Sequence, residues 1–563
     1  MSPQSGRTPA VTTLSATIGT GSRLSAGGDR DYYAVQAGAG EPRLVRAELG
    51  GRAAGAAPAD GAVLYLAQFS DMQITDVQSP GRIEFLEALR GLPGEDIYVP
   101  VARPQEALSL HGFDAAVDTM NALGPSPDTG RRLDLALSTG DNIDNAQANE
   151  LEWFLTVLGG GIVDQNSGAG GYQGAQAPDW DCRVHWHPEG GTDRFTGQWG
   201  FPRSPGLLAA AMAPFTARGL SLPWLSCFGN HEGLAQGIAA PTDGYRELLR
   251  GARKGSALPD GVEPVRDAAV FLRSPERFMT GCPRPVAADS RRRVLTREDF
   301  AKAILAAPGA PAGHGLTADN VRDGTTYGCH DMSTGAAPVR LITLDTADLD
   351  GESEATSGGI GAVQFAWLTD RLREVHSSWW DEGGTLRRAD HADSLVIVAS
   401  HHSLATMRQA SALPRRGYEQ DTSRVPAPRL ADLLHRFPNV VLWLSGHEHV
   451  NRIMPRPDPK RRTPGFWDVS SPATIDWPCQ FRLVELVMDG PGQLVILTTM
   501  TDLAVPVSPQ DATGKARLAS LQRELAANDP YRGMFGMTTA STAGRPEDRN
   551  AVLLRPVSLR RPP

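Results

Sequence analysis

The chain has 563 residues, 40% of them apolar and 21% charged, which is enough to bury a large core. Its formal net charge of −9 at pH 7 argues against a nucleic-acid-binding protein, because phosphate contacts need a basic face. No run approaches the ~18 apolar residues of a membrane span, and residues 1–30 lack the apolar stretch of a signal peptide. The cysteines are scattered without C-x-x-C pairing, as in a reducing compartment. We therefore predict a cytoplasmic chain without membrane contact; the alternative is a start site downstream of a lost export signal.

Strands and helices are predicted to alternate over most of the chain, which indicates an α/β fold. Residues 1–60 form an N-terminal extension, in which residues 32–35 and 44–49 are candidate edge strands of a hairpin. Five nearly continuous apolar runs are typical of strands buried on both faces: residues 63–69, 133–137, 224–228, 395–399 and 440–444. Apolar residues recur at helical spacing over residues 111–123, 146–158, 362–375 and 429–436.

Two stretches interrupt this alternation, residues 159–223 and about 239–328, and we interpret both as long insertions. They flank the polar residues at 229–232, so we expect them to roof one edge of the core. The core itself is predicted to span residues 61–505 and to end in a hairpin over residues 481–499. Residues 506–563 are predicted to form a C-terminal helix, at about 516–527, and an irregular tail.

Each of the five apolar runs is followed by residue types that bind metal ions. The clusters are Asp71-Met72-Gln73, Gly140-Asp141-Asn142-Ile143-Asp144, Gly229-Asn230-His231-Glu232, His401-His402 and Gly446-His447-Glu448-His449. The carboxyl ends of parallel strands lie at one edge of a sheet, so clusters that are distant in sequence are expected to meet in space. Carboxylate, amide and imidazole groups around one point can hold a pair of metal ions that clamps a phosphate.

The order of these motifs resembles that of the calcineurin-like metallophosphoesterase superfamily. The pattern D-x-[H], G-D-x-x-D, G-N-H-[DE], H and G-H-x-H covers about residues 60–500, with four motifs intact and one near match. The resemblance implies a four-layer α/β/β/α sandwich of two mixed sheets. It also implies that residues 61–505 are the catalytic domain and that the insertions lie beside its active site.

The resemblance implies seven metal ligands for two divalent or trivalent ions per chain. These are Asp71, Gln73 and His449 for one ion, Asn230, His401 and His447 for the other, and Asp141 as the bridge between them. Gln73 departs from the pattern, which has histidine at that position. A glutamine amide is a harder donor than imidazole and favours Mn or Fe over Zn, which stays the alternative. Two further alternatives are that Gln73 binds through water and that this site is partly occupied.

Two histidine assignments are implied beside the ligands. Adjacent side chains of an extended segment face opposite ways, so only one of His401 and His402 is expected to reach the metals. The resemblance selects His401 and leaves His402 as a substrate-pocket or structural residue, with the opposite assignment as the alternative. It also implies that His231 protonates the leaving group while Asp144 fixes its tautomer. The alternative for Asp144 is that it only caps the following helix.

Further candidates for substrate contacts lie outside the motifs. His185 and His187 flank Trp186 in the first insertion with Arg183 nearby, a group suited to an anionic substrate. The alternatives for this group are a structural role and the binding of a further metal ion. Tyr327 precedes a core strand and is a candidate for the same edge of the sheet.

These features predict a binuclear metallophosphoesterase, an enzyme that hydrolyses a phosphoric ester by a metal-activated water. Glu232 completes G-N-H-E, which is frequent in the phosphomonoesterase branches of the superfamily and favours a small phosphorylated molecule as substrate. The alternatives are a phosphodiesterase for a cyclic nucleotide or another diester, and a non-catalytic metal-binding scaffold in which Gln73 has disabled one site. The oligomeric state is left open.

Overall fold

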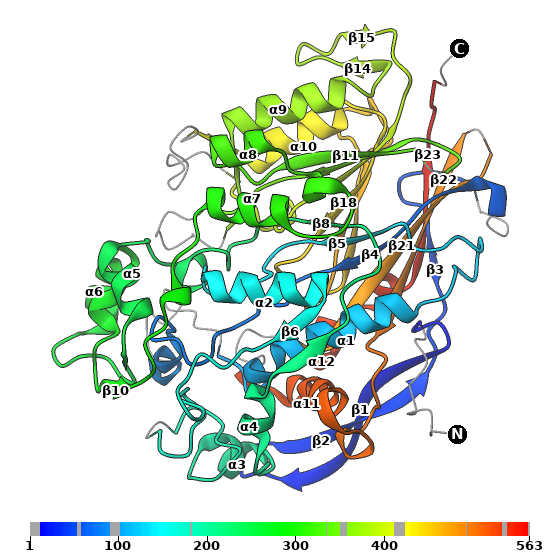
Figure 1. Ribbon diagram of the computed structural model, residues 1–563. Coiled ribbons are helices and arrows are strands. Elements are labelled where there is room, and N and C mark those ends of the chain that lie inside the picture. The colour runs from blue at the N-terminus through cyan, green and yellow to red at the C-terminus, as the bar shows by residue number, and fades with distance from the viewer. Residues whose placement is uncertain are drawn as a thin grey trace.

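The structure is a computed structural model that describes residues 12–52, 58–89, 102–180, 183–333, 335–348, 357–409, 423–490, 492–531 and 538–560. Two large mixed β-sheets lie at its centre and helices pack beside them (Figure 1). The prediction of an α/β fold is therefore confirmed. None of the described helices combines the length and the apolar character needed to cross a membrane.

The first sheet has seven strands, and its parallel part positions three of the polar clusters. In order across the sheet the strands are β3 (Leu44–Arg46), β23 (Ala551–Pro556), β22 (Gln493–Asp502), β21 (Gln480–Met488), β4 (Ala62–Phe69), β5 (Leu135–Ser138) and β8 (Trp224–Ser226). β4, β5 and β8 are parallel, so their carboxyl ends share one edge. Every residue of β4 is buried, which explains its continuous apolar run.

The second sheet has six strands and brings the histidine clusters to its own carboxyl edge. Its order is β11 (Gly328–Met332), β12 (Val339–Thr343), β16 (Leu395–Ala399), β18 (Val440–Ser445), β20 (Phe466–Ser470) and β19 (Arg452–Arg456). β12, β16, β18 and β20 are parallel, whereas β11 and β19 are antiparallel edge strands. Pro455 lies in β19, where an edge strand tolerates the missing N–H group.

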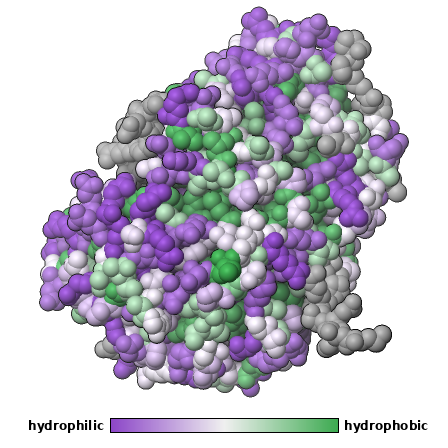
Figure 2. All heavy atoms as spheres, viewed as in Figure 1, coloured by the Kyte–Doolittle hydropathy of each residue, from purple (hydrophilic) through white to green (hydrophobic). Residues whose placement is uncertain are grey.

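Three apolar clusters hold the sheets and helices together. One joins inward side chains of both sheets, such as Leu66 of β4 and Ile397 of β16. A second joins the first sheet to helices α1 (Ser109–Ala122), α2 (Ala148–Gly159), α7 (Arg297–Ala306) and α11 (Gly514–Asn528). A third joins the second sheet to α9 (Ala362–Arg373) and α10 (Ala427–His435). On the face shown in Figure 2, hydrophilic and hydrophobic residues are interspersed.

The insertions contain short elements of their own. The first holds β6 (Gly161–Val163), α3 (Arg194–Trp199), α4 (Leu207–Met212) and β7 (Phe215–Ala217), and the second holds α5 (Asp243–Arg250), β9 (Arg253–Lys254), α6 (Pro264–Arg273), β10 (Arg284–Pro285), α7 and α8 (Ala318–Asp323). We expect from the sequence that the second insertion covers the sheet edge, but only part of it does. Phe300, Ala301 and Ile304 instead pack α7 into the core beside the first sheet.

Both ends of the chain differ in detail from the prediction. The strand that contains residues 32–35, β2 (Asp31–Ala39), pairs with β1 (Ala16–Ala26) rather than with residues 44–49. β3 joins the first sheet beside β23. The C-terminal tail is not irregular, because α12 (Thr539–Ala543) and α13 (Pro546–Arg549) precede β23. The remaining short strands form two pairs: β13 (Ile360–Gly361) with β17 (Arg424–Val425), and β14 (Ser378–Trp380) with β15 (Leu386–Arg388).

Buried His376 makes the stability of the second sheet sensitive to acid. Its Nδ1 donates to Leu372 O at 2.5 Å, while its Nε2 accepts the N–H of Asn439 at 3.2 Å, an arrangement that requires the neutral ring. Burial lowers the pKa of His376 from 6.5 to about 4. Its stabilising contribution is therefore complete above pH 6.5 and is lost as the pH falls through about 4, by up to about 3 kcal/mol.

We expect His376→Gln to flatten the pH dependence of the free energy of unfolding between pH 7 and pH 4. Urea unfolding at several pH values measures this difference. Exposed His391 is the matched position, and His391→Gln should keep the wild-type slope. Equal slopes for wild type and His376→Gln would contradict the assignment.

Candidate metal centre

The loops that follow β4 and β5 run side by side and hold three predicted ligands. The Asp71 N–H donates to Gly140 O at 3.0 Å, and the Gln73 N–H donates to Asp141 O at 2.9 Å. Ile74 and Ile143 extend this pairing as a parallel bridge. Asp71, Gln73 and Asp141 therefore belong to one hydrogen-bonded unit at the edge of the first sheet.

Five predicted ligands have a backbone conformation that is rare outside glycine. Their φ angles are +54° for Asp71, +43° for Gln73, +52° for Asp141, +68° for His447 and +53° for His449. Left-handed backbone at a residue with a side chain costs on the order of 1–3 kcal/mol and persists only where surrounding contacts enforce it. Such strain at five ligands that follow the carboxyl ends of the strands indicates a functional site.

His401 is the centre of one group of donors. Its Nε2 lies 3.2 Å from Asp141 Oδ2, 3.0 Å from Asn230 Oδ1 and 3.2 Å from His447 Nδ1. Its Nδ1 donates to Thr139 O at 2.9 Å, so the lone pair of Nε2 is directed at this group. Asp141, Asn230, His401 and His447 thus lie together as predicted for one ion.

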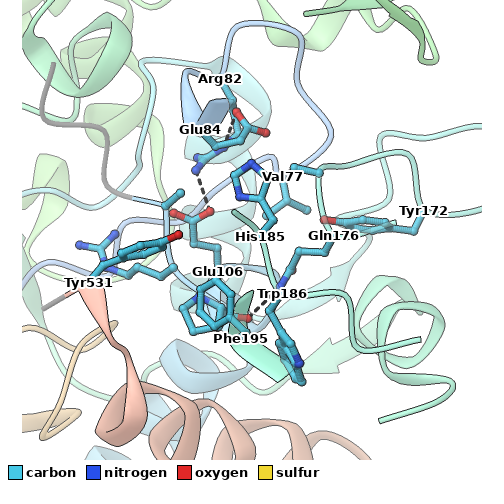
Figure 3. Close-up of a pocket in the computed structure, with 14 residues that line it drawn as sticks. Val77, Arg82, Glu84, Glu106, Tyr172, Gln176, His185, Trp186, Phe195 and Tyr531 are labelled. Atoms are coloured by element: carbon cyan, nitrogen blue, oxygen red, sulfur yellow. Dashed lines mark hydrogen bonds and ion pairs between the residues drawn. The ribbon is translucent and has the colours of Figure 1, made fainter. Parts of the chain in front are cut away.

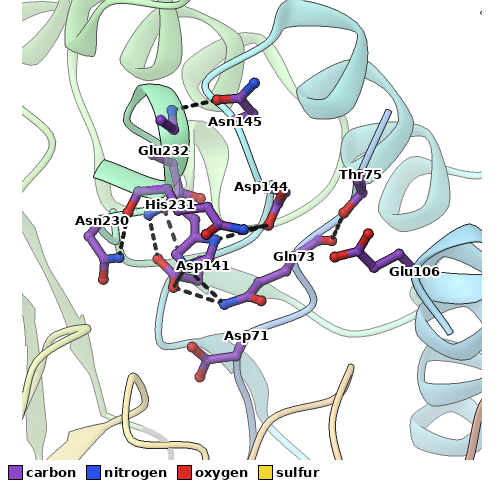
Figure 4. A network of polar contacts seen from close by, with 12 residues as sticks. Asp71, Gln73, Thr75, Glu106, Asp141, Asp144, Asn145, Asn230, His231 and Glu232 are labelled. Carbon is purple, nitrogen blue, oxygen red and sulfur yellow. Dashed lines mark hydrogen bonds and ion pairs between the residues drawn. The ribbon is translucent and has the colours of Figure 1, made fainter. Parts of the chain in front are cut away.

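Asp71, Gln73 and His449 form the second group. His449 Nε2 lies 3.1 Å from Asp71 Oδ1 and 3.3 Å from Gln73 Nε2. Gln73 Nε2 is 3.2 Å from Asp141 Oδ2 (Figure 4). Gln73 Oε1 is buried without a hydrogen-bond partner. Rotating the amide by half a turn would direct this oxygen toward His449 and Asp141, where a cation would satisfy it.

The donor chemistry of the two groups fits a pair of metal ions that share Asp141. Ligand atoms of Asp71, Asp141 and His401 lie within 4.8 Å of one another. Carboxylate, imidazole and amide oxygen together suit Mn, Fe or Zn. The seven predicted ligands are brought to one place from the carboxyl edges of both sheets.

The metal-free histidines have strongly shifted pKa values. Although burial acts against the charged ring, the charge and hydrogen bond of Asp141 raise the pKa of His401 to about 9. Asp71 and Asp476 raise the pKa of His449 to about 9 against the same effect of burial. Burial and the neighbouring charge of His401 lower the pKa of His447 to about 3. Protons and metal ions therefore compete for the same nitrogens.

His402 lies closer to the centre than expected. The rings of His401 and His402 are 4.9 Å apart, and His402 is 4.3 Å from the ring of His447, so the two adjacent side chains do not face opposite ways. Ligand atoms of His401, His402 and His447 also lie within 4.8 Å of one another. His402 Nδ1 is 2.9 Å from Thr346 Oγ1. His401 stays the predicted ligand because its Nε2 contacts Asp141 and Asn230.

His231 and Asp144 form the predicted pair beside the ligands. His231 Nδ1 lies 3.0 Å from Asp144 Oδ1, and His231 Nε2 points toward Asp141 Oδ2 at 3.6 Å. The helix that follows, α2, has Gln147 as its N-cap, and Asp144 does not cap it. The helix-capping alternative for Asp144 is therefore excluded.

Two acidic residues support the site without having been assigned a role in it. Glu232 accepts the backbone N–H groups of Asp141, Asn142 and Gly229, and thereby holds two motif loops together. Asp476, in the loop after β20, lies with Oδ2 2.7 Å from His449 Nδ1. Glu232 belongs to the motif G-N-H-E. β20 is not among the strands predicted from the sequence, which therefore give no reason to single out Asp476.

Asp476 should tighten metal binding by orienting His449. A carboxylate on the second nitrogen of a ligating histidine fixes the tautomer and raises its basicity, and its loss typically weakens metal affinity about 10- to 100-fold. We expect Asp476→Asn to show this loss in calorimetric titration with Mn²⁺. Asp458→Asn, at a buried aspartate that pairs with Arg462, should bind as the wild type does. Unchanged affinity of Asp476→Asn would rule out the orienting role.

The other predicted substrate residues do not form one cluster. Arg183 is exposed, whereas His185 and His187 are buried. Burial lowers the pKa of His185 to about 4, so its ring is neutral at pH 7 and offers no charge to an anion. The Tyr327 ring packs against Trp367 of α9 at 4.8 Å. The burial of His185, His187 and Trp186 favours the structural alternative for this group, and its role in substrate binding stays a prediction.

No protein-family model and no curated protein matches the chain. Among solved structures, it is similar to a putative 5′-nucleotidase from Staphylococcus aureus in complex with alpha-ketoglutarate, at 10% identity and a TM-score of 0.28 over 82% of this chain and 58% of that chain. It is also similar to sulfate thiohydrolase SoxB from Thermus thermophilus in complex with glycerol, at 12% identity and a TM-score of 0.28 over 82% and 60%. The chain thus spans less than two thirds of the length of either structure.

Proposed function

We propose that this chain is a metal-dependent phosphoric ester hydrolase with a binuclear centre, of the calcineurin-like metallophosphoesterase type. The observation that carries the proposal is the convergence of six donors from two sheets around a seventh, Asp141. The motif order that resembles this superfamily and the packing of two sheets between helices both support the proposal. That packing also supports the four-layer α/β/β/α arrangement.

In this proposal each ion has three ligands of its own and shares the fourth. Asp71, Gln73 and His449 would hold one ion, Asn230, His401 and His447 would hold the other, and Asp141 would hold both. Two ions bound in this way would supply positive charge to the phosphoryl oxygens and acidify water. With a glutamine in place of a histidine, the first site should prefer Mn or Fe over Zn.

The protein's own acid–base chemistry would lie with His231. Its Nδ1 is held by Asp144, so Nε2 is the nitrogen that faces the ligand groups and can carry the transferable proton. As the ester P–O bond breaks, His231 Nε2 would donate this proton to the leaving oxygen. The burial of both residues excludes water from this transfer and strengthens their pairing.

The proposed substrate is a phosphomonoester of a small molecule. This preference is supported by Glu232 in the motif G-N-H-E rather than by a contact with substrate, since Glu232 binds the backbone of two loops. Diester hydrolysis would use the same donors, and a non-catalytic scaffold would retain at least one of the two donor groups.

Metal reconstitution and paired substrates test the proposal. The chelated protein is reloaded with Mn²⁺, Fe²⁺ or Zn²⁺, and metal content is measured alongside hydrolysis of 4-nitrophenyl phosphate and bis(4-nitrophenyl) phosphate. Two ions per chain with faster release from the monoester would support the proposal. Activity confined to the bis-ester would favour a phosphodiesterase, and fewer than two ions without hydrolysis would favour a scaffold. Gln73→His, measured in the same way, should shift the metal preference toward Zn²⁺.

A further inference from the structure

A buried arginine lies directly behind the acid–base pair. Arg82 follows the first motif in the sequence, and its side chain is 3% exposed. Its Nη1 pairs with Asp144 Oδ2, while Asp144 Oδ1 contacts His231. Its Nη2 donates to Glu106 Oε2 at 2.7 Å, and its Nε lies 3.8 Å from Glu84 Oε2 (Figure 3). One guanidinium thus links three carboxylates, one of which holds His231.

We propose that Arg82 is a positioning residue that sets the orientation of the His231–Asp144 pair. The inference rests on the proposed function, because it assigns Arg82 a part in the proton transfer by His231. With one oxygen on His231 and the other on Arg82, the Asp144 carboxylate has no freedom to rotate away from the imidazole. The planar guanidinium fork is suited to this task, since its donors are fixed relative to one another.

Arg82 is itself anchored by elements far apart in the sequence. Glu106 lies just before α1, and Glu84 pairs with Lys254 of β9 in the second insertion. Lys254 is fully buried and also donates to Ser79 O at 2.8 Å. A continuous series of charged contacts therefore joins the second insertion to His231, through Lys254, Glu84, Arg82 and Asp144.

Residues of the first insertion lie beside this network. Arg82, Glu84 and Glu106 line a small cavity of about 20 Å³, and His185 faces them across it (Figure 3). Tyr172, Gln176, Trp186 and Phe195 of the first insertion also line the cavity. Removal from bulk water strengthens charged contacts, so the network can hold Asp144 more firmly than a surface pair would.

The test compares substrates that differ in their need for a proton. Departure of 2,4-dinitrophenolate needs little protonation, whereas departure of phenolate needs much more. Arg82→Lys keeps the charge but cannot reach all three carboxylates. We expect kcat for phenyl phosphate to fall roughly 10- to 100-fold and kcat for 2,4-dinitrophenyl phosphate to fall less than about threefold. In the His231→Ala background, Arg82→Lys should cause no further loss.

A matched control separates positioning from general disturbance of the core. Arg292 is equally buried and pairs with Asp76 at 2.8 Å, so Arg292→Lys removes a comparable contact elsewhere. This variant should slow both substrates by similar, small factors. Glu106→Gln keeps the shape of the side chain but weakens the contact that anchors Arg82. If Arg82→Lys fails to fold, this variant allows the same comparison of the two substrates.

The outcomes distinguish this inference from the proposed function. If the wild type hydrolyses neither ester, the proposed function fails. If the wild type and His231→Ala behave as expected but Arg82→Lys and Glu106→Gln affect both substrates equally, or neither, the positioning role of Arg82 is overturned and the proposed function stands.

Discussion

Asp141→Asn should lose bound metal and reduce kcat/KM for 4-nitrophenyl phosphate by roughly 10³-fold or more. Asp141 is the side chain that both donor groups share, with Oδ2 3.2 Å from His401 Nε2 and 3.2 Å from Gln73 Nε2. Asparagine keeps the shape but removes the negative charge that would be shared by two cations. Metal content per chain and steady-state kinetics measure the two losses.

Asp134, at the opposite end of β5 from Asp141, is the control. Asp134 lies just before β5, accepts the N–H of Tyr65 at 2.8 Å and pairs with Arg131. Asp134→Asn should retain two ions and nearly full activity. If Asp141→Asn kept both ions and wild-type kcat/KM, the shared-ligand assignment would be wrong.

The parts of the fold that sequence could predict depend on local patterns. The strands β4, β16 and β18 follow from continuous apolar runs, because each is buried on both faces. The position of Asp141 follows from the same logic, since a ligand after a parallel strand lies at the sheet edge. The left-handed backbone at Asp141 and His449 could not be predicted in this way, because aspartate and histidine adopt other backbone conformations far more often.

The parts that sequence could not predict depend on contacts between distant residues. From the sequence alone, Arg82 is an ordinary polar residue of a loop. Only in the folded chain does it lie against Glu106 and Asp144. β23 was missed for a similar reason. Arg555 breaks the apolar pattern of β23. Its side chain is nevertheless buried, because its N–H groups donate hydrogen bonds to the carbonyl oxygens of Gly465 and Pro438.

The proposed centre would depend on the packing of the two sheets as much as on its ligands. The first sheet supplies Asp71, Asp141 and Asn230, while the second supplies the imidazoles. The apolar cluster between the sheets therefore sets the spacing of the two ligand sets. A cavity in this layer would shift donors by fractions of an ångström, enough to weaken metal binding without any change to a ligand.

His231→Ala should lower kcat for phenyl phosphate by roughly 10²- to 10⁴-fold while the chain keeps both metal ions. His231 Nδ1 is held by Asp144, and its Nε2 faces the ligand groups without being a predicted ligand. Loss of the proton donor should therefore affect poor leaving groups most and leave metal content unchanged. Metal analysis and a series of aryl phosphates of increasing leaving-group pKa measure both effects.

The slope of log kcat against leaving-group pKa decides the role of His231. The wild type, which can protonate the departing oxygen, should show a shallow slope, and His231→Ala a steep one. His435→Gln, at a buried histidine whose Nε2 lies 3.1 Å from Arg456 O, should keep the wild-type slope. Parallel slopes for wild type and His231→Ala would show that another group donates the proton, and loss of metal in His231→Ala would instead make it a ligand.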